Sequence, residues 1–359
     1  MENVRLNNGI TAPILGFGTY QISPSQTKAA VAEALKLGYR SIDTAQYYRN
    51  EAGVGAAVKE SGLPREELFI TTKAMTTGYR ATKLGIDNSL TEAGLDYFDL
   101  MLIHWPMQDD LGTYRALEEA YQAGKLRSIG VSNFNRAQLG EIMANFQTVP
   151  VVDQIETCVL RQQTKLHQYL ADHQIVHEAW SPLGEGAGRL FNHPVLKDLA
   201  AKYDHTTAQV MLRYLTQRQI MVIPRSTNPA HMAANLNIFD FALTAADLRP
   251  GASPRREVLA FRLAVQHDLG RRLLMCYNWI NDVRSSGSQL RRNFIMSDNG
   301  KVDKIKGTVK ETAGDVTDDK KLKAEGILDK TVGKVKEAAE DVKDTAEGVA
   351  KDIKEKFDK

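Results

Sequence analysis

Four titratable side chains stand at the ends of successive β-prone runs in this sequence, and all four are residue types that exchange protons. Asp43 and Tyr48 follow one run, Lys73 ends the next, and His104 ends the run after it. Brought together, such groups perform general acid–base chemistry. Each also has a structural explanation: Asp43 could be a turn or cap residue and Lys73 a solvated lysine. His104 could be a satisfied core histidine, and Tyr48 could pack beside Tyr47. The joint occurrence of all four favours a catalytic role over these separate structural explanations.

The elements that must position these side chains alternate between β-prone runs and segments with helical spacing of apolar residues. Such alternation is the pattern of βα units around a parallel sheet. Eight units in about 220 residues fit an α/β fold of the (β/α)8 TIM-barrel type better than an open doubly wound sheet. The expected strands span residues 14–19, 41–45, 68–74, 97–104, 128–133, 150–156, 175–182 and 220–225.

Three shorter patterns predict further elements of this fold. Asn8-Gly9 lies between short β-prone runs and predicts a type I′ hairpin, which would cover the N-terminal end of the barrel. Ser23, with Pro24 next to it and Gln26 three residues on, predicts a capped helix. Residues 207–215 predict a further amphipathic helix.

The catalytic groups of a TIM barrel gather at the C-terminal ends of its strands. The four titratable residues should therefore face one rim. The later strands bring further polar or aromatic residues to the same rim, namely Ser132, Asn133, Gln154, Trp180, Arg225 and Ser226.

Five motifs extend this interpretation. They occur in the order GYRSIDTAQYYRNEAGVG (38–55), FITTKA (69–74), LIHWP (102–106), KLRSIGVSNF (125–134) and IPRS (223–226). Together they resemble the aldo/keto reductases, most of all the bacterial diketogluconate and methylglyoxal reductase type, and the resemblance covers residues 1–248. It implies an NADP-dependent oxidoreductase that reduces aldehydes and ketones, such as small dicarbonyls or keto sugar acids, to alcohols.

The resemblance makes Asp43, Tyr48, Lys73 and His104 the catalytic residues. Reduction of a carbonyl needs a hydride at carbon and a proton at oxygen, and Tyr48 would give the proton. Because the ordinary pKa of tyrosine is about 10, Lys73 would have to stabilise the phenolate and lower that pKa, with Asp43 holding Lys73 charged. His104 would orient the carbonyl and donate a hydrogen bond to its oxygen.

The hydride would come from NADPH, with NADH as the alternative, because no side chain can supply one. Neither GFGTYQ (16–21) nor GEGAG (184–188) is a complete Rossmann fingerprint, which agrees with the extended dinucleotide binding that the resemblance implies. The implied cofactor-binding residues are Gly18, Thr19, Ser132, Asn133, Gln154, Trp180, Ser181, Leu183, Arg225, Ser226 and Asn235.

Within this set the resemblance assigns separate roles. Trp180 would stack on the nicotinamide, while Ser132, Asn133 and Gln154 hold its carboxamide. The loop 181–188 would cover the pyrophosphate. Arg225 and Ser226 would meet the adenosine 2′-phosphate, since a guanidinium matches a phosphate well.

Several positions depart from the family pattern. His231 stands where a second arginine is usual and Ala234 where a glutamate is common, so the preference for NADPH is expected to be weaker than usual. Met75 stands where members often have tryptophan, so the substrate pocket is expected to be wider. The implied substrate-binding residues are Tyr20, Met75 and Trp105.

The composition is that of an ordinary globular chain of 359 residues, with 43% apolar and 25% charged residues. No stretch approaches the roughly 18 unbroken apolar residues of a membrane span, and the start lacks a secretory pattern. We therefore expect a cytoplasmic protein, a monomer whose partner is a small carbonyl substrate. Cys158 and Cys276 lie far apart without metal-ligand spacing, so neither a disulfide framework nor a metal site is expected.

The formal net charge of +2 is a sum over three unlike segments. Residues 1–248 carry a net −3, residues 249–295, with nine Arg and no Lys, carry +6, and residues 296–359, with fifteen Lys and no Arg, carry −1. These changes predict three parts with boundaries at 248/249 and 295/296. The basic excess comes from the middle part alone, so it does not point to a specific nucleic-acid partner.

The middle segment fits neither neighbour. LTAADL (243–248) begins with a Thr244/Asp247 pair that resembles a capping box, but Arg249-Pro250-Gly251 breaks the helix at once. The C-terminal closure of the barrel is therefore expected to be truncated. We interpret 249–295 as a poorly ordered linker or, preferably, an out-of-frame segment; a basic nucleic-acid or membrane-binding patch is the alternative.

The last segment, 296–359, is rich in Lys, Glu and Asp and contains an internal repeat. GTVKETAGDV (307–316) recurs as GKVKEAAEDV (333–342), with a thin apolar stripe at helical spacing. The segment resembles the CsbD-like bacterial stress-response family, so we expect a helical or disordered tail; a solvated tail without a specific role is the alternative. Two rival hypotheses for the whole chain follow. One is a stress-protection or interaction protein with an inactive barrel, and the other is an artefactual fusion of two reading frames.

Overall fold

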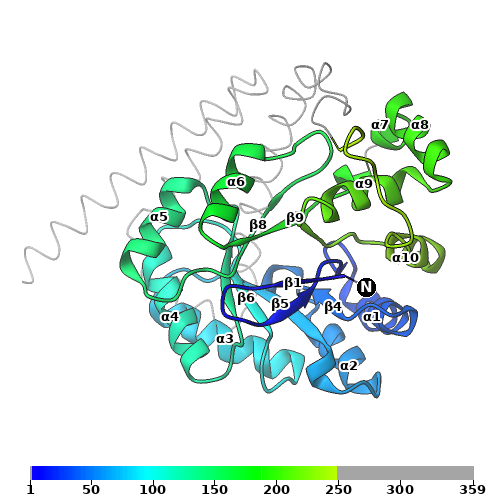
Figure 1. Ribbon diagram of the computed structural model, residues 1–359. Helices are drawn as coiled ribbons and strands as arrows, with labels where there is room; N and C mark the ends of the chain where they lie inside the picture. The colour runs from blue at the N-terminus through cyan, green and yellow to red at the C-terminus, as the bar shows by residue number, and fades with distance from the viewer. Residues whose placement is uncertain (1, 187, 249–359) are drawn as a thin grey trace, which may run out of the picture. The chain divides into compact units, whose positions relative to one another are not determined.

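A computed structural model describes residues 2–186 and 188–248, and within them the chain forms a closed barrel of parallel strands (Figure 1). Neighbouring strands are hydrogen-bonded in the order β10-β9-β8-β7-β6-β5-β4-β3. A parallel bridge from Leu15, just before β3, to Val222 of β10 closes the ring. The predicted (β/α)8 barrel is confirmed. The predicted linker at 249–295 and tail at 296–359 lie outside the described residues.

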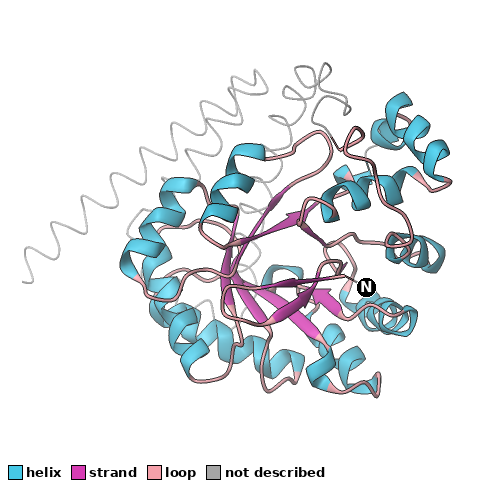
Figure 2. Cartoon of the chain, in the orientation of Figure 1, coloured by secondary structure: helices cyan, strands magenta, loops and turns pink. Residues whose placement is uncertain are grey.

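Each of the eight barrel strands falls within a range predicted from the sequence. Their bounds are β3 Phe17–Gly18, β4 Ser41–Asp43, β5 Phe69–Ala74, β6 Leu100–Ile103, β7 Ile129–Ser132, β8 Val152–Glu156, β9 Val176–Trp180 and β10 Met221–Val222. Figure 2 shows these strands surrounded by helices, which is the arrangement that buries both faces of a parallel sheet.

The helices follow the strands in alternation. Their bounds are α1 Pro24–Leu37, α2 Glu51–Glu60, α3 Tyr79–Ala93, α4 Asp110–Gln122, α5 Arg136–Asn145, α6 Thr164–Asp172, α7 Gly188–Phe191, α8 Pro194–Tyr203, α9 Thr207–Thr216 and α10 Pro229–Leu236. Short 3-10 turns lie at Gln46–Tyr48 (η1), Arg65–Glu67 (η2) and Gly184–Gly186 (η3). In the described part of the chain, no helix is long and apolar enough to cross a bilayer.

The predicted helix after Ser23 is confirmed, but its predicted cap is wrong. Ser23 occupies the N-cap position of α1 without a side-chain bond to a backbone N–H. Its hydroxyl donates instead to Oε1 of Gln26 at 2.9 Å. The N–H of Gln26, which a side-chain cap would bind, donates instead to the Ser23 carbonyl at 3.0 Å.

The predicted N-terminal hairpin pairs β1 (Asn3–Arg5) with β2 (Thr11–Pro13). Its loop is not the predicted two-residue type I′ turn. Leu6 and Ile10 close a three-residue loop, in which only Gly9 has a positive φ, at 88°, as in a turn that ends in a bulge. Asn8 is held elsewhere, because its amide donates to the Arg127 carbonyl and the Ser128 hydroxyl, each at 3.1 Å.

The hairpin covers the N-terminal end of the barrel, as predicted. Its apolar side chains pack with residues from the starts of the barrel strands in one cluster: Val4, Leu6, Ala12, Ile14, Phe69, Leu100, Leu102, Val151, Val152 and Met221. The opposite end of the barrel is therefore the open one, and it is the end where the strands stop.

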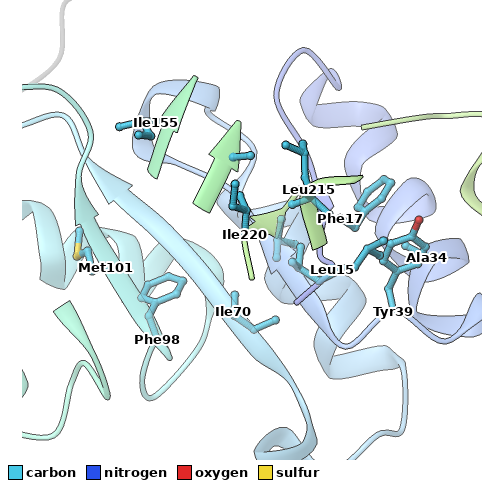
Figure 3. Packing of buried hydrophobic residues seen from close by; sticks show 14 of the residues in the cluster. Leu15, Phe17, Ala34, Tyr39, Ile70, Phe98, Met101, Ile155, Leu215 and Ile220 are labelled. Carbon is cyan, nitrogen blue, oxygen red and sulfur yellow. The ribbon is translucent and has the colours of Figure 1, made fainter. Parts of the chain in front are cut away.

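The main core lies between the strands and the surrounding helices, and it joins the first and last βα units (Figure 3). The rings of Phe17 in β3 and Tyr39 after α1 meet edge to face at 5.7 Å. The Tyr39 hydroxyl donates to the Met232 carbonyl of α10 at 2.9 Å. These contacts tie the start of the barrel to its end within the described residues.

The segment after α10 ends in one helical turn. The Leu248 N–H donates to the Thr244 carbonyl at 3.0 Å, and the Thr244 hydroxyl donates to Asp247 at 2.6 Å. Asp247 also accepts from Lys202 Nζ at 2.7 Å, so this turn is anchored on α8. The residues that were predicted to break the helix begin at Arg249 and lie outside the described residues.

Candidate active site

Asp43, Tyr48 and Lys73 form one connected group at the open end of the barrel. Asp43 ends β4, Lys73 lies near the end of β5, and Tyr48 ends the η1 turn that follows β4. Lys73 Nζ lies 2.5 Å from Asp43 Oδ1 and 3.3 Å from the Tyr48 hydroxyl. The geometry brings a phenol, an ammonium and a carboxylate into a single chain of contacts.

The loop that carries Tyr48 is held by hydrogen bonds of the buried Asn50 side chain. Asn50 donates to the carbonyl oxygens of Thr19 and Ile22, at 3.1 and 3.2 Å, and accepts from the Thr44 hydroxyl at 2.6 Å. The Thr44 carbonyl in turn accepts from Lys73 Nζ at 3.0 Å. The backbone around Tyr48 and the ammonium of Lys73 are therefore fixed by the same loop.

Burial controls the electrostatics of Tyr48. It raises the pKa of Tyr48 to about 12, while the charge and hydrogen bond of Lys73 act to lower that pKa and the Asp43 charge raises it. The predicted effect of Lys73 is present, but burial outweighs it, so the predicted net lowering is wrong. Tyr48 is therefore fully protonated at neutral pH.

Lys73 stays charged although it is completely buried. Burial by itself would lower the pKa of Lys73, but the charge of Asp43 and its hydrogen bond to Lys73 raise that pKa above its ordinary value. The ammonium is thus available to stabilise a negative charge on the Tyr48 oxygen.

His104 follows β6 with its ring centroid 5.7 Å from that of Tyr48. Burial, and then the Lys73 charge, lower the pKa of His104 well below its ordinary value. The neutral ring has one N–H donor and one acceptor nitrogen. Its Nδ1 is buried without a hydrogen-bond partner, and such an atom in a native protein indicates a missing ligand or water.

Ser132, Asn133 and Trp180 are joined by hydrogen bonds at the ends of β7 and β9. The Asn133 amide donates to the Ser132 hydroxyl at 2.9 Å and to the His104 carbonyl at 3.2 Å. Its oxygen accepts from the Trp180 indole N–H at 2.9 Å. Asn133 has a left-handed backbone, with φ 65°, which asparagine tolerates better than most residues.

Gln154 of β8 reaches across the barrel to Asp43 of β4. Its Nε2 donates to Asp43 Oδ2 at 2.9 Å and to Glu178 Oε2 at 2.9 Å. Burial and the Asp43 charge raise the pKa of Glu178 to about 7, against the opposing effects of Gln154 and Lys73. A second buried carboxyl group therefore belongs to this site.

The residues present fit the expected nicotinamide cofactor. The Ser181 hydroxyl is buried without a partner, beside the strand end that carries Trp180. A Cβ at Gly18 would lie 2.8 Å from the Ile223 carbonyl, so only glycine allows β3 to approach the end of β10. The Thr19 hydroxyl donates to the Asp43 carbonyl at 2.9 Å. This bond connects the close approach of β3 and β10 to Asp43.

The remaining predicted cofactor residues lie beyond β10 or in the loop after β9. Arg225 is exposed, and its guanidinium donates to Gln21 Oε1 at 2.9 Å. Ser226 pairs with Asn228, which caps α10, while Asn235 is buried in that helix and Leu183 packs on the core. Within the described residues, no hydrogen bond or ion pair joins Arg225, Ser226, Leu183 or Asn235 to Asp43, Tyr48 or Lys73.

The predicted substrate residues flank the catalytic group. The ring of Tyr20 lies 5.1 Å from that of Tyr48, and the ring of Trp105 lies 6.4 Å from His104 and 6.3 Å from Trp180. Met75 is 6% exposed, and its backbone N–H donates to Gln46 Oε1 at 2.8 Å. Tyr20 therefore lies beside Tyr48, and Trp105 lies beside His104.

Sequence reasoning missed Asn50, Gln46 and Glu178 as parts of the site. Asn50 and Gln46 stand within the motif at 38–55, so the motif itself was the available signal. Glu178 lies two residues before Trp180 on β9, and strand periodicity puts both on the same face. A glutamate inside the apolar run IVHEAW was the signal that could have revealed it.

The comparisons with known proteins agree with this geometry. The aldo/keto reductase family model matches residues 14–250, and a CsbD-like model matches residues 298–348. The glyoxal reductase of Bacillus subtilis is 42% identical over 69% of this chain and 90% of its own length. A methylglyoxal reductase of Escherichia coli is 40% identical over 67% of this chain and 88% of its own length.

Solved structures give the same result. An aldo/keto reductase from Brucella melitensis is 43% identical, with a TM-score of 0.66 over 69% of this chain and 96% of its own. A Bombyx mori aldo-keto reductase in complex with NADP is 36% identical, with a TM-score of 0.66 over 69% of this chain and 90% of its own. The chain thus belongs to the aldo/keto reductase family, as an oxidoreductase that acts on carbonyl groups, and carries in addition a C-terminal CsbD-like region.

Proposed function

We propose that the barrel reduces small aldehydes and ketones with NADPH and that Tyr48 donates the proton. The observation that carries this proposal is the contact between the Tyr48 hydroxyl and Lys73 Nζ at 3.3 Å, with Lys73 paired to Asp43. A protonated phenol beside a permanent buried cation is a general acid whose anion is stabilised as it forms.

The reaction needs two transfers to the carbonyl group. When bound, the reduced nicotinamide supplies the hydride to the carbonyl carbon. Tyr48 transfers its proton to the carbonyl oxygen, and its own oxygen becomes a phenolate that faces the Lys73 ammonium. His104, which is neutral, donates a hydrogen bond to the same carbonyl oxygen and orients it. The alcohol leaves with both hydrogens, and Tyr48 regains its proton from water.

The described residues also suggest how the cofactor is held. Ser132, Asn133 and Gln154 would position the carboxamide, Trp180 would stack on the ring, and Ser181 has an unpartnered hydroxyl for a phosphate or ribose oxygen. Arg225 and Ser226 would meet the 2′-phosphate beside the start of α10. The NADP of the silkworm relative supports NADPH, whereas His231 leaves NADH as an alternative.

The substrate class rests on the relatives that are named for glyoxal and methylglyoxal. Small dicarbonyls would lie between Tyr20 and Trp105, whose rings are beside those of Tyr48 and His104. Keto sugar acids are the second group of substrates to try, because Met75 has no indole to narrow the pocket.

The test is oxidation of NADPH by the purified full-length chain with methylglyoxal, followed at the nicotinamide absorbance. Tyr48→Phe is the matched control, because it removes one oxygen and keeps the ring that packs on Tyr20. We expect the wild type to turn over and Tyr48→Phe to lose about 10²- to 10⁴-fold in kcat. Equal rates for the two proteins would contradict the role of Tyr48.

A separate proposal concerns the organisation of the chain. We infer a reductase at 1–248, a linker or out-of-frame segment at 249–295 and a CsbD-like region at 296–359. The two family matches, at 14–250 and 298–348, support this division. Tryptic peptides that span 248/249 and 295/296 in source cells would show that the parts are made as one chain, and would eliminate the hypothesis of an artefactual fusion.

The CsbD-like match also keeps the stress-protection hypothesis open for the C-terminal region. If the barrel were inactive, full-length protein would show no NADPH oxidation above Tyr48→Phe, yet would still protect a heat- or drying-sensitive test enzyme. Turnover by the wild type would remove the inactive-barrel part of that hypothesis.

A further inference from the structure

Glu178 is a buried acid that the mechanism above does not use. It lies on β9, 1% exposed, and is paired in register with Gln154 of β8 and with Met221 of β10. Unpaired burial of a carboxyl group is costly, so its position beside the catalytic group calls for an explanation.

The contacts of Gln154 supply that explanation. An amide nitrogen carries two hydrogens, and those of Gln154 Nε2 are directed to Asp43 Oδ2 and Glu178 Oε2, both at 2.9 Å. The carboxyl groups of Asp43 and Glu178 lie on either side of the Gln154 amide nitrogen. They fix the orientation of the amide, because its oxygen would be repelled by both carboxyl groups if it took the place of Nε2. Asp43 and Glu178 thus clamp the nitrogen end of Gln154.

This clamp leaves Gln154 with only its oxygen for a ligand. An oxygen accepts hydrogen bonds and donates none, so a clamped Gln154 can recognise an N–H group but not a carbonyl. The nicotinamide carboxamide carries both, an amide N–H2 and a carbonyl. The orientation of Gln154 therefore determines which end of the carboxamide it binds.

We propose that Glu178 is a positioning residue that clamps Gln154, so that Gln154 Oε1 accepts a hydrogen bond from the carboxamide N–H2 of the nicotinamide cofactor. This inference rests on the proposed function, since it assumes that the barrel binds NADPH. It assigns the selectivity for the amide group of the cofactor to a residue that does not touch the cofactor.

The clamp has a dependence on pH. The groups that act on Glu178 are Asp43 from β4, Lys73 from β5 and Gln154 from β8, while Met221 is its partner in register on β10. An ionised Glu178 accepts a stronger hydrogen bond than a protonated one, and burial raises its pKa to about 7. The clamp is therefore stronger above neutral pH than below it.

The test compares the binding of two reduced cofactors by quenching of tryptophan emission, without turnover. One is NADPH, and the other is its 3-acetylpyridine analogue, in which a methyl group replaces the amide N–H2. In the wild type we expect NADPH to bind about five- to tenfold more tightly at pH 8, the value of one hydrogen bond, with a smaller ratio at pH 6. The two ligands share the 2′-phosphate, so its own titration cancels in the ratio.

Three variants separate the clamp from a merely structural role. Glu178→Met removes one of the two carboxyl acceptors and leaves Asp43, so the ratio should fall below that of the wild type at pH 8 and no longer depend on pH. Glu178→Gln keeps an acceptor oxygen without a charge, so the ratio should stay above that of Glu178→Met and be the same at pH 6 and pH 8. Glu156→Gln makes the same chemical change on β8, where Glu156 pairs with Arg161, and should behave as the wild type.

The outcomes also distinguish this inference from the proposed function. A wild type that binds no NADPH contradicts the proposed function. A wild type that binds NADPH but does not discriminate against the analogue overturns the clamp alone, as does an unchanged ratio in folded Glu178→Met. Unfolding of Glu178→Met leaves the pH dependence of the isosteric Glu178→Gln as the deciding measurement.

Discussion

The Lys73 ammonium lies 2.5 Å from Asp43 Oδ1, and both side chains are almost completely buried. Removal of one member of a buried ion pair leaves the other charge without compensation, which costs about 3–5 kcal/mol. We therefore expect Asp43→Ala to lower the free energy of unfolding by this amount in chemical denaturation.

The exposed pair of Lys28 and Glu60 is the matched control, with an N···O distance of 2.7 Å and side chains 51% and 63% exposed. Glu60→Ala should cost about 1 kcal/mol or less, because water screens the pair. Equal losses for Asp43→Ala and Glu60→Ala would show that burial does not govern the Lys73 pair.

Asn133 offers a measure of backbone strain at the rim. Its φ of 65° lies in the left-handed region, which costs most side chains about 1–2 kcal/mol and costs glycine little. Both Asn133→Ala and Asn133→Gly lose the bond to the Trp180 indole. We expect Asn133→Gly to be more stable than Asn133→Ala by about 1 kcal/mol in thermal or chemical denaturation, and the reverse order would exclude strain at this position.

Much of this site was predictable because it follows from strand ends. Asp43, Lys73 and His104 could be placed on one rim once eight βα units had been counted, since parallel strands end on the same side. Glu178 could not be placed in this way. Its importance depends on the sheet register that sets Gln154 opposite it, and register is not visible in one sequence.

The errors of sequence reasoning have physical causes of the same kind. The prediction of a type I′ turn at Asn8-Gly9 was wrong because the Asn8 side chain is hydrogen-bonded to Arg127 and Ser128, which lie 119 and 120 residues away. The sign of the Tyr48 pKa shift failed because residue types reveal the charge of Lys73 but not the burial that outweighs it. Local patterns therefore identified elements and residue types, while long-range packing decided their detailed chemistry.

His231 is predicted to limit the preference for NADPH. It lies exposed in the first turn of α10, near Ser226 and the Asn228 cap, and its imidazole lacks the permanent charge and forked donors of an arginine. His231→Arg should raise the ratio of the NADH Kd to the NADPH Kd by about fivefold, the value of one exposed charge contact. Fluorescence titration checks this, and His231→Gln should leave the ratio unchanged.

The buried carboxyl group of Asp153 should make the free energy of unfolding depend on pH. It is fully buried on β8, and burial raises its pKa well above the ordinary value, against the weaker opposing effect of a backbone hydrogen bond from Phe134. The folded chain therefore binds this proton more tightly than the unfolded chain, so ionisation of Asp153 destabilises the fold as pH rises above the unfolded pKa.

Asp153→Asn removes this ionisation and should raise the free energy of unfolding at pH 8 by roughly 1–3 kcal/mol. The gain should shrink toward pH 4, where the native carboxyl group is already protonated. Denaturation curves at both pH values decide the matter, and a gain that is the same at pH 4 and pH 8 would refute the assignment.

Gly18 marks the place where the barrel closes beside the predicted cofactor site. Its N–H donates to the Pro224 carbonyl at 3.1 Å, and an added Cβ would lie 2.8 Å from the Ile223 carbonyl oxygen, closer than such contacts allow. Gly18→Ala must push β3 away from the chain that leads to Arg225. We expect a loss of about 1–3 kcal/mol in the free energy of unfolding and weaker binding of NADPH.

Gly140 is the matched control, because it lies within α5 and an added Cβ would meet only the Tyr169 hydroxyl, at 3.9 Å. Gly140→Ala should stabilise the chain by up to about 1 kcal/mol through helix propensity and leave the Kd of NADPH unchanged. If Gly18→Ala also bound NADPH with the wild-type Kd, the closure at Gly18 would have no part in cofactor binding. Opposite effects of the two substitutions on the free energy of unfolding would show that the loss in Gly18→Ala comes from the close approach of β3 to the end of β10. The loss of a glycine would not by itself explain it.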